Sequence, residues 1–476
     1  KTADIICAHT LMDAAIDLAD RGLAEHSTEA CDKLVRALSV ALSISDKYRI
    51  SRIADAMIRY EDKTAKTELE GTWGFSYDQL VENKKVPLTD DQVATIINAL
   101  EVRLKEAAEI PEGQNMPRDP FAAEHAAIRL ARHYRRCVKP ENVKRVLTIY
   151  TGAFELMSRN ASAMLGTAWM RKVFDILTEF DQKDEADKVA VLMRVLGKGT
   201  SKEMAKFSHK MEISNKDIEA YLNEITKGDE DTVLARIAHT FVPDPKKVEA
   251  QLKEIASGAI LWGMVSHAIV DSEGREIARV GSVQDDLEGR VVMMMSQNMQ
   301  LESPFLRMCL ERWIAQFGVT AESLADRLIQ SPLFSAERRG LLLKAADAYL
   351  RGEHATAVHI LVPQIEQAFR MCVALSNRSI YKKGRHGGLN VKLLDDLLRD
   401  PIVEQVFGAN AIQYFKVLLT DQRGWNVRNN ICHGLIDVPD TSPVLTDRLL
   451  HVALILSMIR RKEDHASGCE APGAME

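Results

Sequence analysis

Three residues near the C-terminal end of the chain bring a guanidinium, an amide and an imidazole into one short segment. They are Arg428, Asn429 and His433, and Gly434 follows directly. If the segment is helical, Asn429 and His433 lie one turn apart on the same face, and the long side chain of Arg428 can bend round to join them. Glycine often ends a helix because it adopts the left-handed conformation readily. The pattern therefore predicts a polar trio, Arg428, Asn429 and His433, at the end of a short helix.

The polar trio has the groups that RNA cleavage requires. The ribose 2′-OH is itself the nucleophile, so a protein needs only to transfer protons and to stabilise the charged phosphorane, and we expect neither a metal nor another cofactor. His433 would transfer protons. Arg428 would stabilise negative charge, and Asn429 would orient the arginine, the histidine or the phosphate by hydrogen bonding. We therefore interpret all three as candidate catalytic residues.

The spacing between the arginine and the histidine gives only weak support. The same Arg-x4-His spacing occurs at Arg21 with His26 and at Arg460 with His465, in neither case with an amide beside the arginine. The assignment therefore depends on the residues around the polar trio.

These surrounding residues resemble a known family. The similarity begins at Leu333 and is carried mainly by two motifs, Pro-Gln-x-Glu-x3-Arg ending at Arg370 and Gly-x-Asn-x-Arg-Asn-x3-His-Gly ending at Gly434. Together they resemble an uncharacterised HEPN-like family (nucleotide-binding in higher eukaryotes and prokaryotes) that includes the endoplasmic-reticulum membrane-associated RNA degradation protein. The resemblance implies a C-terminal HEPN-like helical bundle with endoribonuclease activity that leaves 2′,3′-cyclic phosphate ends.

The resemblance also implies how the bundle assembles and acts. HEPN bundles usually pair so that two Arg-x4-His motifs line one cleft, which implies a homodimer with a composite active site. Many relatives are RNA-cleaving toxins or antiviral-defence effectors, and we expect such an enzyme here. The alternative is a non-catalytic protein that uses the bundle to bind RNA, a nucleotide or a protein partner. A scaffold in which the bundle only dimerises is a third interpretation.

Three further residues of these motifs are expected to support the polar trio. Glu366 and Arg370 are four positions apart on one predicted helix. They either form an intrahelical ion pair or hold Arg428 or the phosphate from beneath. Asn426 belongs to the second motif and precedes the short helix.

A basic loop is the candidate RNA-binding segment. From Arg378 the chain reads Arg-Ser-Ile-Tyr-Lys-Lys-Gly-Arg-His-Gly-Gly, which combines positive charge, one aromatic ring and flexible glycines. This composition is typical of a loop that follows an RNA backbone, and a solvated basic loop is the other interpretation. The candidate RNA-binding residues are Arg378, Tyr381, Lys382, Lys383 and Arg385.

The charge balance restricts where a nucleic-acid site can lie. The chain of 476 residues has 62 Lys and Arg against 68 Asp and Glu, so it is not a polycation that would coat nucleic acid indiscriminately. Residues 354–463, in contrast, have 14 Lys and Arg against 10 Asp and Glu. A nucleic-acid site should therefore be local and C-terminal.

The cysteines and the apolar segments indicate the environment. The seven cysteines are scattered without a C-x-x-C pair, which indicates neither a disulfide framework nor a Cys-rich zinc site and favours a reducing, cytoplasmic location. The most apolar C-terminal stretch, 449–459, is too short to span a bilayer, so we expect no membrane association.

Apolar residues recur at helical spacing along almost the whole chain, which predicts a mainly α protein. Two short strands around a glycine-containing turn, 267–270 and 275–280, predict a β-hairpin. The second N-terminal region has helix pairs that are either repeat-like or irregular, and the N-terminal helices are a candidate surface for a regulatory protein partner. We expect an N-terminal helical domain (1–115), a second helical region (116–255), a connector with the hairpin (256–334), the HEPN-like bundle (335–463) and a flexible tail (464–476).

The bundle should contain six helices, the last of which is apolar on most sides and should form a central stave. Their expected ranges are 337–351, 354–377, 391–399, 410–420, 427–433 and 444–461.

Overall fold

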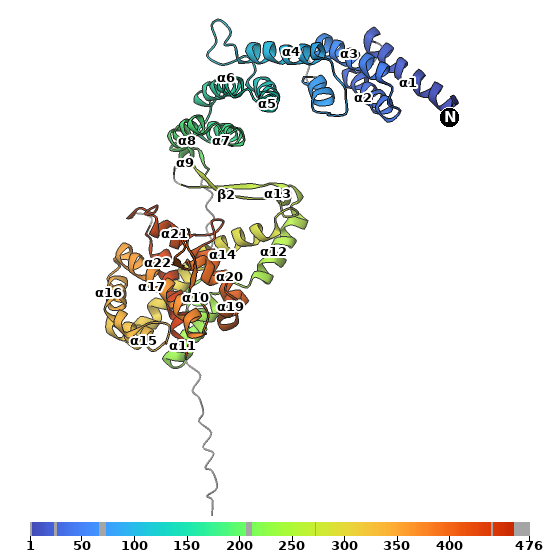
Figure 1. The fold of residues 1–476 in the computed structure, drawn as a ribbon. Helices are drawn as coiled ribbons and strands as arrows, with labels where there is room; N and C mark the ends of the chain where they lie inside the picture. Colours follow the sequence, from blue (N-terminus) through green and yellow to red (C-terminus); the bar gives the residue numbers. More distant parts are fainter. Residues whose placement is uncertain are drawn as a thin grey trace, which may run out of the picture. The chain divides into compact units, whose positions relative to one another are not determined.

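The computed structural model describes residues 2–22, 26–65, 73–205, 212–271, 273–438 and 441–460. Most of these residues are helical, and the described strands form two short antiparallel hairpins (Figure 1). The mainly α fold and the hairpin expected in the connector are both confirmed. The expected tail, 464–476, lies outside the described residues. In the described part of the chain, no helix is both long and apolar enough to cross a membrane.

The chain divides into two compact units, residues 1–207 with 271–275 and residues 208–270 with 276–476. The predicted boundary after residue 115 lies inside the first unit, and the one after residue 334 lies inside the second. The segment that resembles HEPN proteins is therefore packed together with more than a hundred residues that precede it.

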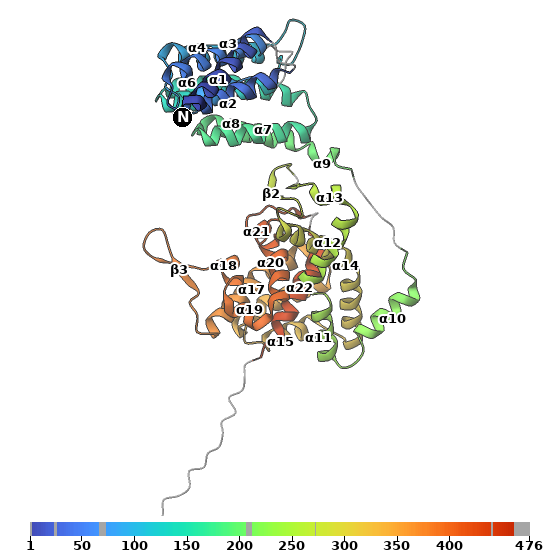
Figure 2. The ribbon, with the colours of Figure 1, turned by 90° about the vertical axis from the view of Figure 1, so that its right-hand side faces the viewer.

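The first unit has one apolar core, which extends from Met12 to Leu192. Helices that follow one another in sequence pack together, and α7 and α8 lie side by side (Figure 2). The elements are α1 (Thr2–Arg21), α2 (Ser27–Ser43), α3 (Lys47–Thr64), the π-helix η1 (Tyr77–Val81), α4 (Asp90–Ala108), α5 (Pro120–Arg136), α6 (Pro140–Arg159), α7 (Ala163–Glu179), α8 (Lys183–Gly197) and α9 (Thr200–Glu203).

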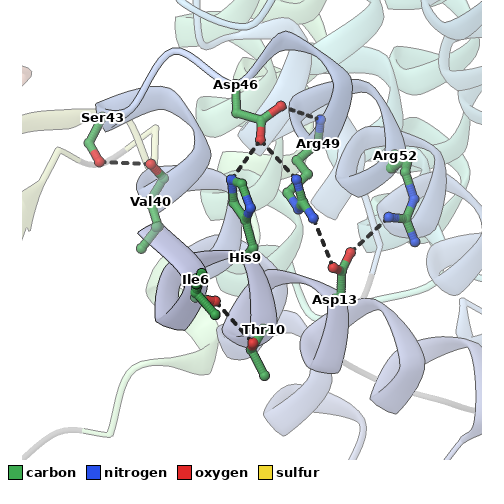
Figure 3. Close-up of polar contacts among 9 residues, drawn as sticks. All are labelled: Ile6, His9, Thr10, Asp13, Val40, Ser43, Asp46, Arg49 and Arg52. Carbon is green, nitrogen blue, oxygen red and sulfur yellow. Dashed lines mark hydrogen bonds and ion pairs between the residues drawn. The ribbon is translucent and has the colours of Figure 1, made fainter. Parts of the chain in front are cut away.

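A charged network fixes the first helices of this unit against each other (Figure 3). Asp46 caps the N-terminus of α3 by accepting the backbone N–H of Arg49, and it also pairs with His9 of α1 at 3.3 Å. Asp13 of α1 accepts from Arg49 at 3.1 Å and from Arg52 at 2.7 Å. Two carboxylates thus join α1 to the first turns of α3.

The second unit contains the remaining elements. They are α10 (Asn215–Ile225), α11 (Glu230–Thr240), α12 (Pro245–Gly258), α13 (Ile260–Met264), β1 (His267–Val270), β2 (Glu276–Val280), α14 (Leu287–Phe317), α15 (Ala321–Ile329), the 3₁₀ helix η2 (Ala336–Arg338), α16 (Arg339–Leu350), α17 (His354–Leu375), β3 (Tyr381–Lys383), β4 (Leu389–Val391), α18 (Leu394–Leu398), α19 (Pro401–Phe407), α20 (Ala409–Leu419), α21 (Val427–Cys432) and α22 (Pro443–Ser457).

The helices expected in the bundle are present, with two differences. The expected helix from residue 391 begins only at Leu394, because Val391 ends strand β4 and pairs with Tyr381. Helix α19 was not expected. It begins with Pro401, and the Asp400 carboxylate accepts the backbone N–H of Ile402, which is a common start for a short helix.

Helix α22 is the central stave of the second unit, as its composition predicts. It contacts α11, α14, α15 and α17, so it is buried on nearly every side. Three of its buried side chains are ionisable, namely Asp447, Arg448 and His451. The helix therefore has to satisfy several polar groups in the interior of the unit.

Two of these groups, Arg448 and His451, bind backbone carbonyls of other helices. Arg448 donates to Phe241 O at 3.0 Å and to Met299 O at 2.6 Å. His451 Nε2 donates to Ile237 O at 3.2 Å, because a carbonyl oxygen can only accept, and its Nδ1 accepts from the hydroxyl of Tyr414 at 2.9 Å. Burial lowers the pKa of His451 to about 3, so this ring is neutral in the folded chain.

We expect acid to destabilise the second unit partly through His451. Its folded-state pKa of about 3 lies below the ordinary value of 6.5, so the unfolded chain binds the proton first and stability is lost as the pH falls from 6.5 toward 3. The loss should approach about 1.4 kcal/mol per pH unit. Urea unfolding between about pH 7 and pH 5 should show this slope in the wild-type chain and a shallower one in His451→Gln. Equal slopes would mean that other groups control acid unfolding.

Candidate functional site

The candidate site is built on α21, a helix of six residues that packs against α17 and α20. Val427 and Ile431 are its buried residues, and they join the apolar core of the second unit. Burial of these two residues fixes the rotation of the helix, which leaves Arg428 and Asn429 half-buried and Cys432 and His433 exposed.

Two residues of the second motif determine the path of the backbone just before α21. A Cβ atom at Gly424 would lie 2.2 Å from the carbonyl oxygen of Val417, so only glycine fits there. Asn426 has a φ of +50°, a left-handed conformation that asparagine tolerates better than most residues. Trp425 anchors the approach by donating from Nε1 to Ser296 O at 3.2 Å, which favours its interpretation as a packing residue.

Gly434 ends α21 as the sequence predicts. Its φ is +64°, its N–H donates to Ile431 O at 3.1 Å, and the next N–H, of Leu435, donates to Asn430 O at 2.8 Å. These two bonds form a Schellman motif. The N–H of His433 donates to Asn429 O at 3.0 Å, so the histidine and the asparagine are one helical turn apart.

Glu366 of α17 is the anchor of the site. Its carboxylate accepts from Arg428 Nε at 2.8 Å and from Arg428 Nη2 at 3.4 Å, and also from Arg370 Nη2 at 2.9 Å. The three side chains are only 12–18% exposed. The two interpretations of Glu366 and Arg370 are therefore compatible, since the intrahelical pair exists and the same carboxylate holds Arg428.

Two asparagine side chains extend the hydrogen-bond network that starts at Glu366. Arg428 Nη1 donates to Asn429 Oδ1 at 3.2 Å, and Asn429 Nδ2 donates to Asn426 Oδ1 at 2.7 Å. The structure thus brings Glu366, Arg428, Asn429 and Asn426 into one network. Asn429 orients the arginine rather than the histidine.

The site carries one more positive than negative charge, because one carboxylate faces two guanidiniums. Hydrogen bonds to Glu366 raise the pKa of Arg428 above its ordinary value, so this group stays charged at any physiological pH. A guanidinium has five N–H donors, and Arg428 uses three of them within the network. Within the described part of the chain nothing accepts from the other two, which remain for an anion such as a phosphate.

His433 stands apart from this network. Its ring is exposed and has no hydrogen bond or ion pair among the described residues. The helix backbone places it one turn from Asn429, but no direct contact joins it to Arg428 within the described part of the chain. Arg428 and His433 therefore lie close together in the chain, but only the side chain of Arg428 is held in place by hydrogen bonds.

The five candidate RNA-binding residues lie on or beside the second hairpin, β3–β4, which the sequence did not predict. All five are exposed. Arg378 pairs with Asp400 at 2.7 Å and Lys382 pairs with Asp396, so these two positive charges are compensated. Lys383 and Arg385 have no ion pair among the described residues. The uncompensated charge therefore lies at the tip of the hairpin.

Sequence reasoning did not single out Gln367, which accepts from Arg370 Nη1 at 2.7 Å and completes the surroundings of that arginine. Its position inside the Glu-x3-Arg motif was the available signal. Among the described residues, no three His, Cys, Asp or Glu side chains are arranged to hold a metal ion.

No protein-family model, curated protein or solved structure matches the chain. Membership of the HEPN superfamily therefore stays a prediction, and the function has to be argued from the geometry of the site.

Removal of the Glu366 charge should cost more stability than removal of either arginine partner. In Glu366→Gln two half-buried guanidiniums lose their counter-ion, whereas Arg370→Gln leaves Arg428 paired. Breaking a buried pair costs about 3–5 kcal/mol, and we expect about 2–3 here because the side chains keep some exposure. Arg370→Gln should cost about 1 kcal/mol. Urea unfolding measures both.

The matched control is Asp347→Asn, which breaks an exposed intrahelical pair with Arg351 in the same unit. It should cost at most about 0.5 kcal/mol. A cost for Glu366→Gln no larger than that of the control would show that Glu366 does not anchor the site.

Proposed function

We propose that this protein is a metal-independent endoribonuclease that cleaves RNA by attack of the ribose 2′-OH and leaves 2′,3′-cyclic phosphate ends. One observation carries the proposal: the charged Arg428, fixed by Glu366, has two N–H donors outside the network, and it lies five residues, about 1.4 helical turns, before an exposed imidazole, that of His433. This pairing supplies the two kinds of group that the reaction needs.

Each residue has a separate task in this reaction. The spare donors of Arg428 bind the scissile phosphate and stabilise the negative charge that develops on it. His433 transfers protons, either from the 2′-OH or to the leaving 5′ oxygen. Asn429 and Glu366 position the arginine, and Asn426 positions Asn429. Because Glu366 does not face the substrate in this scheme, it is a positioning residue.

A single copy presents one His433, whereas cyclisation uses both a base and an acid. We propose that the active form is a homodimer in which two copies of the polar trio line one cleft. The exposure of Cys432, His433, Gly434 and Leu435 leaves this end of α21 accessible to a second copy. We also propose that it acts as a toxin or antiviral-defence effector. A nuclease of this kind needs restraint in the cell that makes it, and we propose the N-terminal helices as the surface for a regulatory partner.

Cleavage should continue in EDTA and should depend on both catalytic residues. We expect His433→Ala and Arg428→Ala each to lower the single-turnover rate by about 10²-fold or more, because general acid–base catalysis and charge stabilisation each contribute at that level. Purified chain is incubated with total RNA in EDTA, and the product ends are identified by their resistance to phosphatase before acid treatment.

The control for His433→Ala is His239→Ala, which removes another exposed histidine of the same unit and should keep full activity. Arg428→Lys separates charge from geometry, since lysine lacks the forked donors that bind Glu366 and phosphate together. RNA that stays intact while it binds the wild-type chain would refute the nuclease and favour the non-catalytic RNA-binding protein, which needs the hairpin but not His433.

RNA affinity should depend on the tip of the β3–β4 hairpin. The double variant Lys383→Ala/Arg385→Ala removes two uncompensated charges, so the slope of log Kd against log salt should fall by about 1.4, or 0.7 for each lost phosphate contact. Fluorescence anisotropy with a short single-stranded RNA measures this slope.

The matched double variant is Arg378→Ala/Lys382→Ala, which changes the net charge equally but removes charges that are already paired with aspartates. Its effect on the slope should be clearly smaller. Equal effects would show that only overall charge matters and that the hairpin tip is not an RNA contact.

A further inference from the structure

A pocket of about 350 Å³ lies in the second unit, where α10, the end of α11 and the middle of α14 meet. Its lining comes from these three segments, and none of the lining residues belongs to the polar trio or to the network around Glu366. The pocket is therefore built from residues to which the proposed nuclease gives no role.

Apolar and aromatic side chains form most of the walls of this pocket. Tyr221 of α10 and Phe305 of α14 contact each other edge to face, with ring centroids 5.8 Å apart. Ile218 lies one turn before Tyr221 on the same face of α10. These three side chains are only partly buried, so each keeps apolar surface that a ligand could cover.

Glu302 brings a reachable carboxylate to these walls. It lies one turn before Phe305 on α14, and its side chain is 46% exposed. In the described part of the chain its one ionic partner is Arg448, whose Nη2 is 3.7 Å from Glu302 Oε2, and it accepts no hydrogen bond there. Partial burial raises the pKa of Glu302 more than the Arg448 guanidinium lowers it. The charge of Glu302 is therefore only partly compensated.

The charge of the lining is negative. Besides Glu302 it contains Asp217, whose carboxylate accepts from Ser214 Oγ at 2.7 Å, and it contains no lysine, arginine or histidine. The Arg448 side chain has no exposed surface, so a ligand in the pocket cannot reach its guanidinium. The accessible charges of the pocket are thus two carboxylates.

These features select the kind of ligand. An anion would be repelled by both carboxylates. A metal ion would lack ligands, because no three His, Cys, Asp or Glu of the described residues are arranged to hold one. A neutral apolar molecule would cover Glu302 without pairing its charge. An organic cation with an apolar body meets both requirements, and the hydroxyls of Tyr221 and Thr240 can accept from it as well.

We propose that this pocket binds a small primary amine with an apolar body, whose ammonium donates to the Glu302 carboxylate and whose body packs against Tyr221, Phe305 and Ile218. The ligand has one charged end, so it needs only one charged anchor, and Asp217 adds negative potential without having to touch it. An ammonium beside aromatic rings also gains cation–π attraction. The volume lies toward the lower end of the range of small-molecule pockets, which favours a small ligand.

The test uses the full chain and isothermal titration calorimetry. The amine probes are butylamine, cyclohexylmethylamine and 2-phenylethylamine, which vary the apolar body. For 2-phenylethylamine, 2-phenylethanol replaces the ammonium by a hydroxyl and phenylacetate replaces it by an anion. We expect the alcohol to bind the wild-type chain about tenfold more weakly than the amine, because it lacks the charge-assisted hydrogen bond, and phenylacetate to bind more weakly still.

Substitutions in the pocket separate the charge from the apolar walls. Glu302→Gln should raise the Kd of the amine about tenfold and leave that of the alcohol nearly unchanged. Phe305→Ala should raise the Kd of both probes, because both lose the same ring contact. The matched control is Glu219→Gln, which removes another carboxylate of the unit, one that is paired with Arg312 and does not line the pocket. It should leave both values unchanged.

Thermal unfolding shows whether each variant is folded. The comparison of amine with alcohol on the wild-type chain tests the charge requirement even if Glu302→Gln does not fold. The proposal is overturned if none of the three amines shows saturable binding, if 2-phenylethanol binds as tightly as 2-phenylethylamine, or if folded Glu302→Gln binds the amine like the wild-type chain.

Discussion

Arg448 lies on a helix that has no solvent-facing side, so its charge must be satisfied in the interior of the second unit. Its guanidinium donates to the carbonyls of Phe241 and Met299, which belong to segments far away in the sequence. His451 binds Ile237 O from the next turn of the same helix. These bonds hold α11 and α14 against α22, and an apolar side chain at either position would lose its hydrogen bonds to them. The packing of the C-terminal segment therefore depends on residues that precede it by 149 to 214 positions.

In the candidate site too, a polar contact between two helices fixes a charged side chain, here at the edge of that core. Glu366 lies on α17, which packs against α22, and its carboxylate fixes Arg428 on the much shorter α21. A helix of six residues has little stability of its own. Its position comes from two buried apolar residues, from the close approach at Gly424 and from this ion pair. The position of the Arg428 side chain is therefore fixed by the long helix α17 rather than by the short helix α21.

The sequence predicted the local features well and the distant ones poorly. Gly434 ends α21 because only its left-handed conformation permits the two final bonds, and a glycine after a helical pattern predicts that directly. The contact between Glu366 and Arg428 was one of two interpretations, since 62 residues separate them. The sequence predicted a loop where the β3–β4 hairpin lies. The strands are short, and the glycines between them, Gly384, Gly387 and Gly388, are typical of a loop. The contacts of Arg448 could not be predicted from the sequence around it, because its partners are backbone carbonyls far away along the chain.

The unequal restraint of Arg428 and His433 has a chemical reason if the chain cleaves RNA. The arginine must meet a phosphate whose position is fixed by the rest of the substrate, so preorganisation lowers the barrier. The imidazole must exchange protons with solvent between turnovers, which an exposed ring does readily and a buried one such as His451 cannot. A fixed cation beside an open proton carrier therefore fits repeated acid–base catalysis better than it fits tight binding alone. In a binding protein, both groups would gain from being held.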